Sequence, residues 1–119
     1  MRDFKLLKVW EKAHRLTLAV YKASAAFPKA ELFGLTSQLR RACASVPANI
    51  AEGCGRGGEI ELARYFQISA GSANEAEYHL LLARDLGYLD TASCDLLLNE
   101  LTEVRRMIYS YSTKLKADG

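Results

Sequence analysis

The chain has 119 residues, of which half are hydrophobic and a quarter are charged, a composition that excludes an intrinsically disordered protein. No apolar run approaches the ~18 residues of a membrane-spanning helix, and the charged N-terminal segment lacks the apolar centre of a signal peptide. We therefore expect a cytoplasmic protein that forms one domain over residues 1–119. The formal net charge of +2 by itself points to no partner.

The first helix is predicted over residues 4–27. Asp3 is placed to cap it, and Pro28 ends it because the residue before a proline avoids the helical region. Residues of core type recur at helical spacing along this segment: Leu6, Trp10, Ala13, Thr17 and Val20.

The second helix is predicted over residues 31–54, with a proline inside it. A stripe at spacings of three and four continues in phase across Pro47: Leu35, Leu39, Ala42, Val46, Ile50 and Cys54. Proline removes one backbone hydrogen bond, so the segment is predicted to be one helix kinked at Pro47.

Two further helices are predicted, over residues 59–86 and 91–116. The first has an apolar stripe through Ile60, Ala63, Phe66, Ala70 and Ala73, and its small residues 69–73 favour close packing by a neighbour. The second is capped by Asp90 or Thr91 and has the cleanest heptad rhythm of the chain: Leu97, Leu101, Val104, Ile108, Tyr111 and Leu115.

Short connections join these four segments, and no stretch alternates with period two. Short links make sequential helices antiparallel neighbours. The predicted fold is therefore all-α, an antiparallel up-down-up-down four-helix bundle.

Six residues at the end of the second predicted helix, Gly53 to Gly58, match the dinucleotide-binding pattern G-x-G-x-x-G. Glu75 and Glu77 follow about 20 residues later, where that motif places a ribose-binding carboxylate. The motif requires a strand before the glycines, whereas the residues before Gly53 repeat at helical spacing. We therefore predict a helix end and a turn, and no cofactor.

Polar residues form a second stripe on the same helix, which we call the polar ladder: Gln38, Arg41, Ser45, Asn49, Glu52 and Arg56. Its last three members could join in a hydrogen-bonded ion-pair cluster. Two interpretations stay open, a solvated helix face and a polar seam between subunits.

The charges are unevenly distributed. Residues 1–29 hold seven basic and two acidic residues, whereas residues 58–90 hold two basic and six acidic ones. Such a chain can pair with itself or show one face to a polyanion. Five basic residues of the first segment form a basic stripe, the candidate nucleic-acid-binding residues: Lys5, Lys8, Lys12, Arg15 and Lys22.

The basic stripe suits a phosphate backbone, although a single stripe of this kind is more often a solvated face. No aromatic run accompanies it, so sequence-specific recognition of single strands is not indicated. Secondary basic candidates, equally able to serve subunit contacts, are Arg40, Arg41, Arg105 and Arg106.

The residues that could support catalysis are few. His14 and His79 are the two histidines, and Glu75 lies four residues before His79 without forming a Glu-x-x-His pair. Three cysteines, Cys43, Cys54 and Cys94, form no C-x-x-C pair and are expected to be buried thiols in a reducing cytosol. We predict no catalytic residue, no metal ligand and no enzyme.

Several of these residues carry a family resemblance, which covers nearly the whole chain. The run Gln38–Ala42, the run Ser45–Gly53 and the pair Gly55-Arg56 resemble the signature of the 23S rRNA intervening-sequence proteins. Further matches are Phe27-Pro28, Glu31, Phe33–Leu35, Ile68, Ala70–Ser72, Glu75 and Leu86–Tyr88.

The resemblance implies a bacterial four-helix bundle that assembles into a homopentamer and has no defined catalytic residues. It also implies a gene often located within an insertion in 23S rRNA genes. A related bundle, the accessory subunit of diversity-generating retroelements, is a pentamer that binds nucleic acid through basic surfaces. We therefore expect a homo-oligomeric ring that binds RNA or DNA without sequence preference, or alternatively a protein-binding scaffold ring without nucleic acid.

Overall fold

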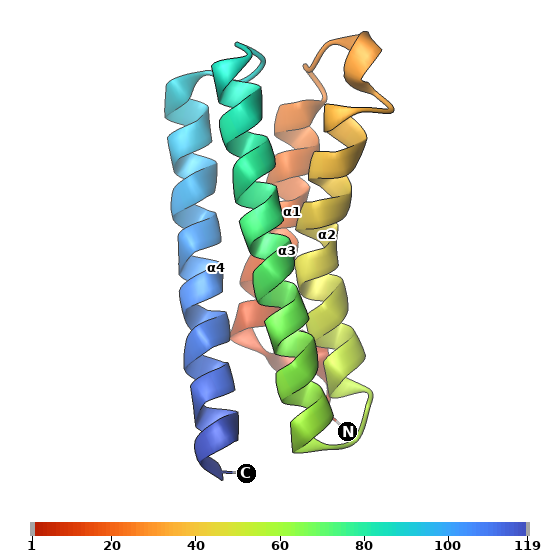
Figure 1. The fold of residues 1–119 in the computed structure, drawn as a ribbon, viewed down its shortest axis with the longest axis vertical. Coiled ribbons are helices and arrows are strands. Elements are labelled where there is room, and N and C mark those ends of the chain that lie inside the picture. Colours follow the sequence, from red (N-terminus) through yellow and green to blue (C-terminus); the bar gives the residue numbers. More distant parts are fainter. Residues whose placement is uncertain (1, 119) are drawn as a thin grey trace.

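The computed structural model describes the backbone of residues 2–118 and the side chains of residues 2–115. The described residues form four long helices and no strand, which confirms the all-α prediction (Figure 1). The long helices are α1 (Lys8–Ser24), α2 (Leu35–Cys54), α3 (Glu59–Asp85) and α4 (Thr91–Asp118). Two short 3₁₀ helices, η1 (Phe4–Leu6) and η2 (Lys29–Glu31), precede α1 and α2.

The four helices lie side by side along the 45 Å length of the molecule. In Figure 1, α1 leads from the end that holds the N-terminus to the opposite end, and α2, α3 and α4 each reverse the direction of the helix before. Each helix contacts the next along the chain, and α4 also contacts α1. Every helix therefore has two neighbours and one outward face.

The first helix differs from its prediction at both ends, because α1 spans Lys8–Ser24 rather than residues 4–27. Asp3 caps η1 instead, where its carboxylate accepts a hydrogen bond from the Lys5 amide at 3.0 Å. Leu7 then adopts an extended backbone that separates η1 from α1. Leu6 is consequently 81% exposed and lies outside the core, contrary to its place in the predicted stripe.

The second helix begins at Leu35 rather than at residue 31, because η2 and a break at Gly34 precede it. The Glu31 carboxylate accepts a hydrogen bond from the Leu35 amide at 3.1 Å and another from the Tyr88 hydroxyl at 3.1 Å. The second bond raises the pKa of Tyr88. Glu31 thus connects the start of α2 to the turn between α3 and α4.

Helix α2 continues through Pro47, so the segments on its two sides form one helix. Pro47 has no N–H to donate to the Cys43 carbonyl four residues earlier. The Thr17 hydroxyl of α1 lies 3.4 Å from that carbonyl oxygen and donates to the Ala13 carbonyl at 2.8 Å. The one hydroxyl proton of Thr17 is directed at Ala13 and offers the Cys43 carbonyl only a long, shared contact in place of the bond that the proline removes. The bend at Pro47 stays a prediction.

Helices α2 and α3 approach each other along small residues. Ala73 and Ala76 are fully buried, and the Ser69 hydroxyl donates to the Val46 carbonyl of α2 at 2.9 Å. At Gly53, a Cβ atom would lie 2.8 Å from the Tyr65 Cβ atom. The predicted close packing of the third helix is therefore confirmed.

The remaining apolar stripes form a single core, against which the half-buried Trp10 and Ala63 pack, with two further exceptions. The heptad residues of α4 are buried as predicted, apart from Tyr111, which is half-buried and stacks on Phe66 with ring centroids 4.8 Å apart. Ile60 is 85% exposed in the first turn of α3, so its place in the predicted stripe is wrong. All three cysteines are buried thiols as expected, and burial raises the pKa of Cys43 to about 11.

Two glycine substitutions test the close approach of α2 and α3. In Gly53→Ala the added methyl would meet Tyr65 and Leu62, so the free energy of unfolding should fall by roughly 1–3 kcal/mol. In Gly71→Ala the added methyl enters open space on α3. The better helix propensity of alanine should therefore raise the free energy of unfolding by up to about 1 kcal/mol. Urea denaturation measures both changes, and equal stability of the two variants would contradict the packing argument.

The start of α4 supplies a pH-dependent prediction. The Asp90 carboxylate accepts hydrogen bonds from the Ser93 amide and hydroxyl, each at 2.8 Å, and the amide bond lowers the pKa of Asp90. This stabilisation is present above the unfolded carboxyl pKa of ~3.9 and is lost as the pH falls through the lower folded pKa. Asp90→Ala should therefore melt at a lower temperature than the wild type at pH 7, with the difference shrinking in acid. Asp95→Ala, elsewhere on α4, is the control that should show neither effect.

Candidate nucleic-acid interface and assembly surface

The basic stripe is divided between two elements. Lys8, Lys12, Arg15 and Lys22 lie on α1, whereas Lys5 lies on η1. Lys5 is paired with Asp3 at 3.2 Å, and Arg15 is paired with Glu11 one turn earlier on α1. Lys8, Lys12 and Lys22 have no ion pair among the side chains that the structure describes. Within the basic stripe, the positive charge that no carboxylate neutralises therefore belongs to these three lysines.

Three of the four secondary basic candidates are engaged within the chain. The Arg40 guanidinium donates to the Ser24 hydroxyl at 2.8 Å and lies 4.7 Å from the centre of the Tyr21 ring. Arg105 pairs with Glu77 at 2.6 Å, and Arg106 pairs with Glu103 at 3.5 Å. The fourth, Arg41, is exposed.

The middle of the polar ladder lies between α2 and α3 of the same chain. Ser45 and Ser72 share a hydrogen bond of 2.9 Å between their hydroxyl oxygens. The Asn49 amide donates to the Ser45 carbonyl and to the Ser45 hydroxyl, each at 2.8 Å. Ser45 therefore serves the contact between two helices of one chain, and Asn49 is bonded to Ser45 within α2.

The lower end of the polar ladder forms a separate cluster. Arg56 pairs with Glu52 at 3.5 Å and donates to the Tyr65 hydroxyl of α3 at 2.9 Å. Asn49 bonds to Ser45 instead. Of the cluster considered from the sequence, the Glu52–Arg56 pair is therefore present and Asn49 is not part of it. Gln38 and Arg41, at the other end of the ladder, are exposed.

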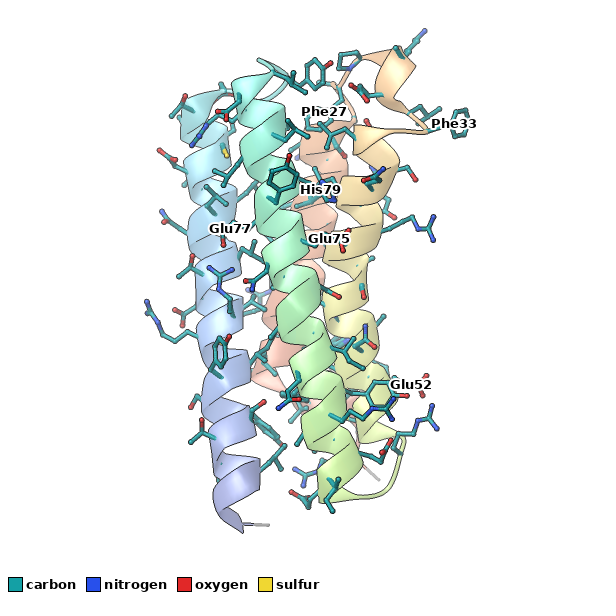
Figure 2. The ribbon with its side chains drawn as sticks, viewed as in Figure 1. Phe27, Phe33, Glu52, Glu75, Glu77 and His79 are labelled. Atoms are coloured by element: carbon teal, nitrogen blue, oxygen red, sulfur yellow. The ribbon has the colours of Figure 1, made fainter. Side chains whose placement is uncertain are left out.

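The glycine-rich segment ends α2 and turns the chain into α3, as predicted. Gly57 has a φ of +84°, a conformation that favours glycine. No strand precedes the turn in the described chain, and Figure 2 places Glu75 and Glu77 in the opposite half of the bundle. The turn therefore lacks the structural context of a dinucleotide site.

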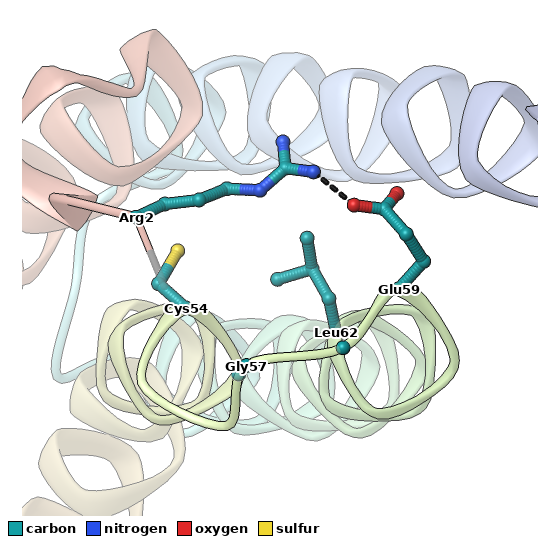
Figure 3. A pocket seen from close by; sticks show the side chains of 7 residues that line it. Arg2, Cys54, Gly57, Glu59 and Leu62 are labelled. Atoms are coloured by element: carbon teal, nitrogen blue, oxygen red, sulfur yellow. Dashed lines mark hydrogen bonds and ion pairs between the residues drawn. The ribbon is translucent and has the colours of Figure 1, made fainter.

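A hollow of about 310 Å³ lies beside this turn, lined by Arg2, Cys54, Gly57, Glu59 and Leu62 among others (Figure 3). The Arg2 amide donates to the Cys54 carbonyl at 3.1 Å, and the Arg2 guanidinium pairs with Glu59. Burial raises the pKa of the Cys54 thiol. The Glu59 carboxylate neutralises Arg2 and already occupies the helix N-terminus of α3, where an anion would otherwise be favoured. The hollow therefore does not attract an anion.

The two histidines are engaged with neighbouring side chains. His14 stacks on Trp10 with ring centroids 5.0 Å apart, and the His79 Nε2 atom lies 3.3 Å from a Glu75 carboxylate oxygen. The His79 Nδ1 atom is buried without a hydrogen-bond partner. No group of three metal-ligating side chains occurs in the described part of the chain.

Packing of α1 against α4 creates a feature that the sequence did not reveal. A groove of about 330 Å³, here the α1–α4 groove, is lined by Leu7, Lys8, Val9, Met107, Ser110, Tyr111 and Lys114. Lys8 and Lys114 lie near opposite ends of the chain, and no linear motif connects them. The one sequence signal was the heptad that placed Tyr111 on the inner face of α4.

These observations define the class of protein: an all-helical chain of four long helices with a basic face on α1. Within the described residues, no helix is long and apolar enough to cross a membrane. The sequence matches the family of 23S rRNA-intervening sequence proteins over residues 5–110, and the chain belongs to this family.

One solved structure supports the fold. It is a crystal structure of a protein of unknown function from the S23 ribosomal protein family of Bacteroides thetaiotaomicron VPI-5482. The two chains are 23% identical and superpose with a TM-score of 0.78, over 87% of this chain and 97% of the other. No curated protein gives a significant match.

Two ladder substitutions separate contacts within the chain from contacts between chains. Ser45→Ala leaves the Ser72 hydroxyl without its partner, so it should lower the melting temperature without changing the mass of the assembly. Arg41→Glu reverses an exposed charge and should lower the mass measured by light scattering. An unchanged mass for Arg41→Glu would remove this residue from the candidate seam.

Proposed function

We propose that this protein is a non-catalytic four-helix bundle that forms a homo-oligomeric ring, a pentamer, and binds RNA or DNA without sequence preference. The observation that carries the proposal is the unpaired charge of Lys8, Lys12 and Lys22 on one helix. A Lys ammonium that no carboxylate neutralises can release the counterions of a phosphate backbone.

Repetition in a ring supports this reading. Each copy would add the same three lysines, so a ring multiplies the local charge while the net charge per chain stays at +2. The family name refers to sequences that intervene in 23S rRNA, which is consistent with a nucleic-acid partner. The proposal includes up-down-up-down packing, a bend of α2 at Pro47 and a cytoplasmic location, where three buried free thiols are stable.

The absence of catalysis is part of the proposal. The exposed His14 is stacked on Trp10 and the buried His79 is bonded to Glu75, so each imidazole is engaged with a neighbouring side chain. The thiol of Cys43 is a weak nucleophile at neutral pH, since burial raises its pKa to about 11.

A scaffold ring that binds a protein remains the second candidate, favoured by one observation. Phe33 is 93% exposed and projects from the connection between η2 and α2, beside the half-exposed Leu32 (Figure 2). An exposed aromatic side chain of this kind can anchor a protein partner. A pull-down with and without nuclease separates the candidates, because only partners held by nucleic acid are lost after digestion.

Substitutions that remove positive charge from α1 test nucleic-acid binding. Lys8→Gln with Lys12→Gln should weaken binding to duplex DNA and to structured RNA at low salt. The slope of log affinity against log salt concentration should also become less negative by about one to two. Each lost phosphate contact contributes about 0.7–0.9 to this slope. Fluorescence anisotropy over a series of salt concentrations measures both quantities.

The matched control removes the same charge from α3, which does not contact α1. Arg64→Gln with Arg84→Gln affects two arginines that are already paired with Glu61 and Asp85. It should leave affinity within about twofold, since paired surface charges contribute little. No binding by the wild type, or equal weakening in both double variants, would defeat the proposal.

A further inference from the structure

The α1–α4 groove combines an apolar floor with positively charged rims. Its floor is formed by Leu7, Val9, Met107 and the ring of Tyr111, and its rims carry the Lys8 and Lys114 side chains. Its volume of about 330 Å³ lies at the lower end of the range of small-ligand sites. A groove of this size accepts one flat ring system and is too small for a duplex.

The Tyr111 ring in the floor of the groove is held in place by contacts with other side chains. The Tyr111 ring stacks on the buried Phe66 ring at an interplanar angle of 28°. The Tyr111 hydroxyl accepts a hydrogen bond from Arg2, and Arg2 is paired with Glu59. Tyr111 is thus fixed by packing and by a charged network, so the groove is formed before any ligand binds.

The charge at the rims indicates the chemistry of the occupant. Lys8 and Lys114 have no carboxylate partner among the described side chains, and Lys12 continues the positive charge along α1. The complement of such a groove is a flat, largely apolar group connected to anions on both sides. A nucleotide within a single strand has this chemistry, because its base is flanked by two phosphates.

We infer that the α1–α4 groove binds one unpaired base of a single-stranded nucleic acid, with Lys8 and Lys114 on the neighbouring phosphates. The inference rests on the proposed nucleic-acid binding and extends it. The basic stripe binds any phosphate backbone, whereas the groove distinguishes an unpaired base from a base stacked in a duplex. An isolated pocket of this kind adds affinity for single strands without reading their sequence.

An abasic oligonucleotide tests the inference with the wild-type protein alone. Two fluorescent probes of equal length and charge are compared, an oligothymidine and the same backbone without bases. If a base occupies the groove, the oligothymidine should bind at least about fivefold more tightly, as expected for one base on an aromatic platform. Equal affinities would overturn the inference and leave the proposed function intact, whereas no binding of the oligothymidine, of its duplex or of structured RNA would overturn both.

A substitution that fills the groove gives a second, independent readout. Ser110 is exposed and lines the groove, so the indole of Ser110→Trp should occupy it and lower the oligothymidine affinity about fivefold. Duplex binding should stay within about twofold. Thr102→Trp makes a similar change at an exposed position of α4 outside the groove and should change neither affinity. Unchanged oligothymidine binding by Ser110→Trp, or a fall in its assembly mass alone, would instead exclude the groove as the base site.

Discussion

The close approach of α2 and α3 is the constraint on which the rest of the structure depends. Gly53 leaves no room for a Cβ atom against Tyr65, and the fully buried Ala73 and Ala76 keep the two backbones close farther along. Because small side chains determine this distance, they also determine the register between the helices. Ser45 then meets Ser72, and Arg56 reaches Tyr65.

The contact between α2 and α3 also decides which residues of the polar ladder are used within the chain and which remain exposed. A polar stripe beside an apolar stripe on one helix predicts either a solvated face or an interface between subunits. The register with α3 uses Ser45 inside the chain, Asn49 bonds to Ser45 on the same helix, and Gln38 and Arg41 stay exposed. The part of the ladder available to a second copy is therefore smaller than its periodicity suggests.

Helix α1 lies across the bundle from α3 and contacts α2 and α4 instead. Its outward face carries the exposed Lys8 and Lys22, with the half-buried Lys12 beside them, and Lys8 also lines the α1–α4 groove. Tyr111 connects this groove to the core through Phe66 and to the N-terminal segment through Arg2. The basic face and the groove are therefore parts of one surface, built on the side of the molecule that the α2–α3 contact leaves open.

Hydrophobic periodicity in the sequence was sufficient to identify four helices, no strands and most of the core, because burial of one face repeats every three or four residues. It failed at Leu6 and Ile60, which continue a stripe numerically but lie at element ends, where the chain changes direction. The position of Asp3 also misled, since a capping residue stabilises a 3₁₀ turn as readily as an α-helix.

The sequence by itself thus determined the helices, the buried thiols and the presence of a basic segment, all of which depend on local spacing and composition. Only the tertiary structure decided whether Arg105 is free, because its pairing with Glu77 joins two helices and depends on their distance in space. Only the tertiary structure brought Lys8 to Lys114. The physical reason is that a groove between helices belongs to their packing, and no local pattern encodes residues that meet from opposite ends of the chain.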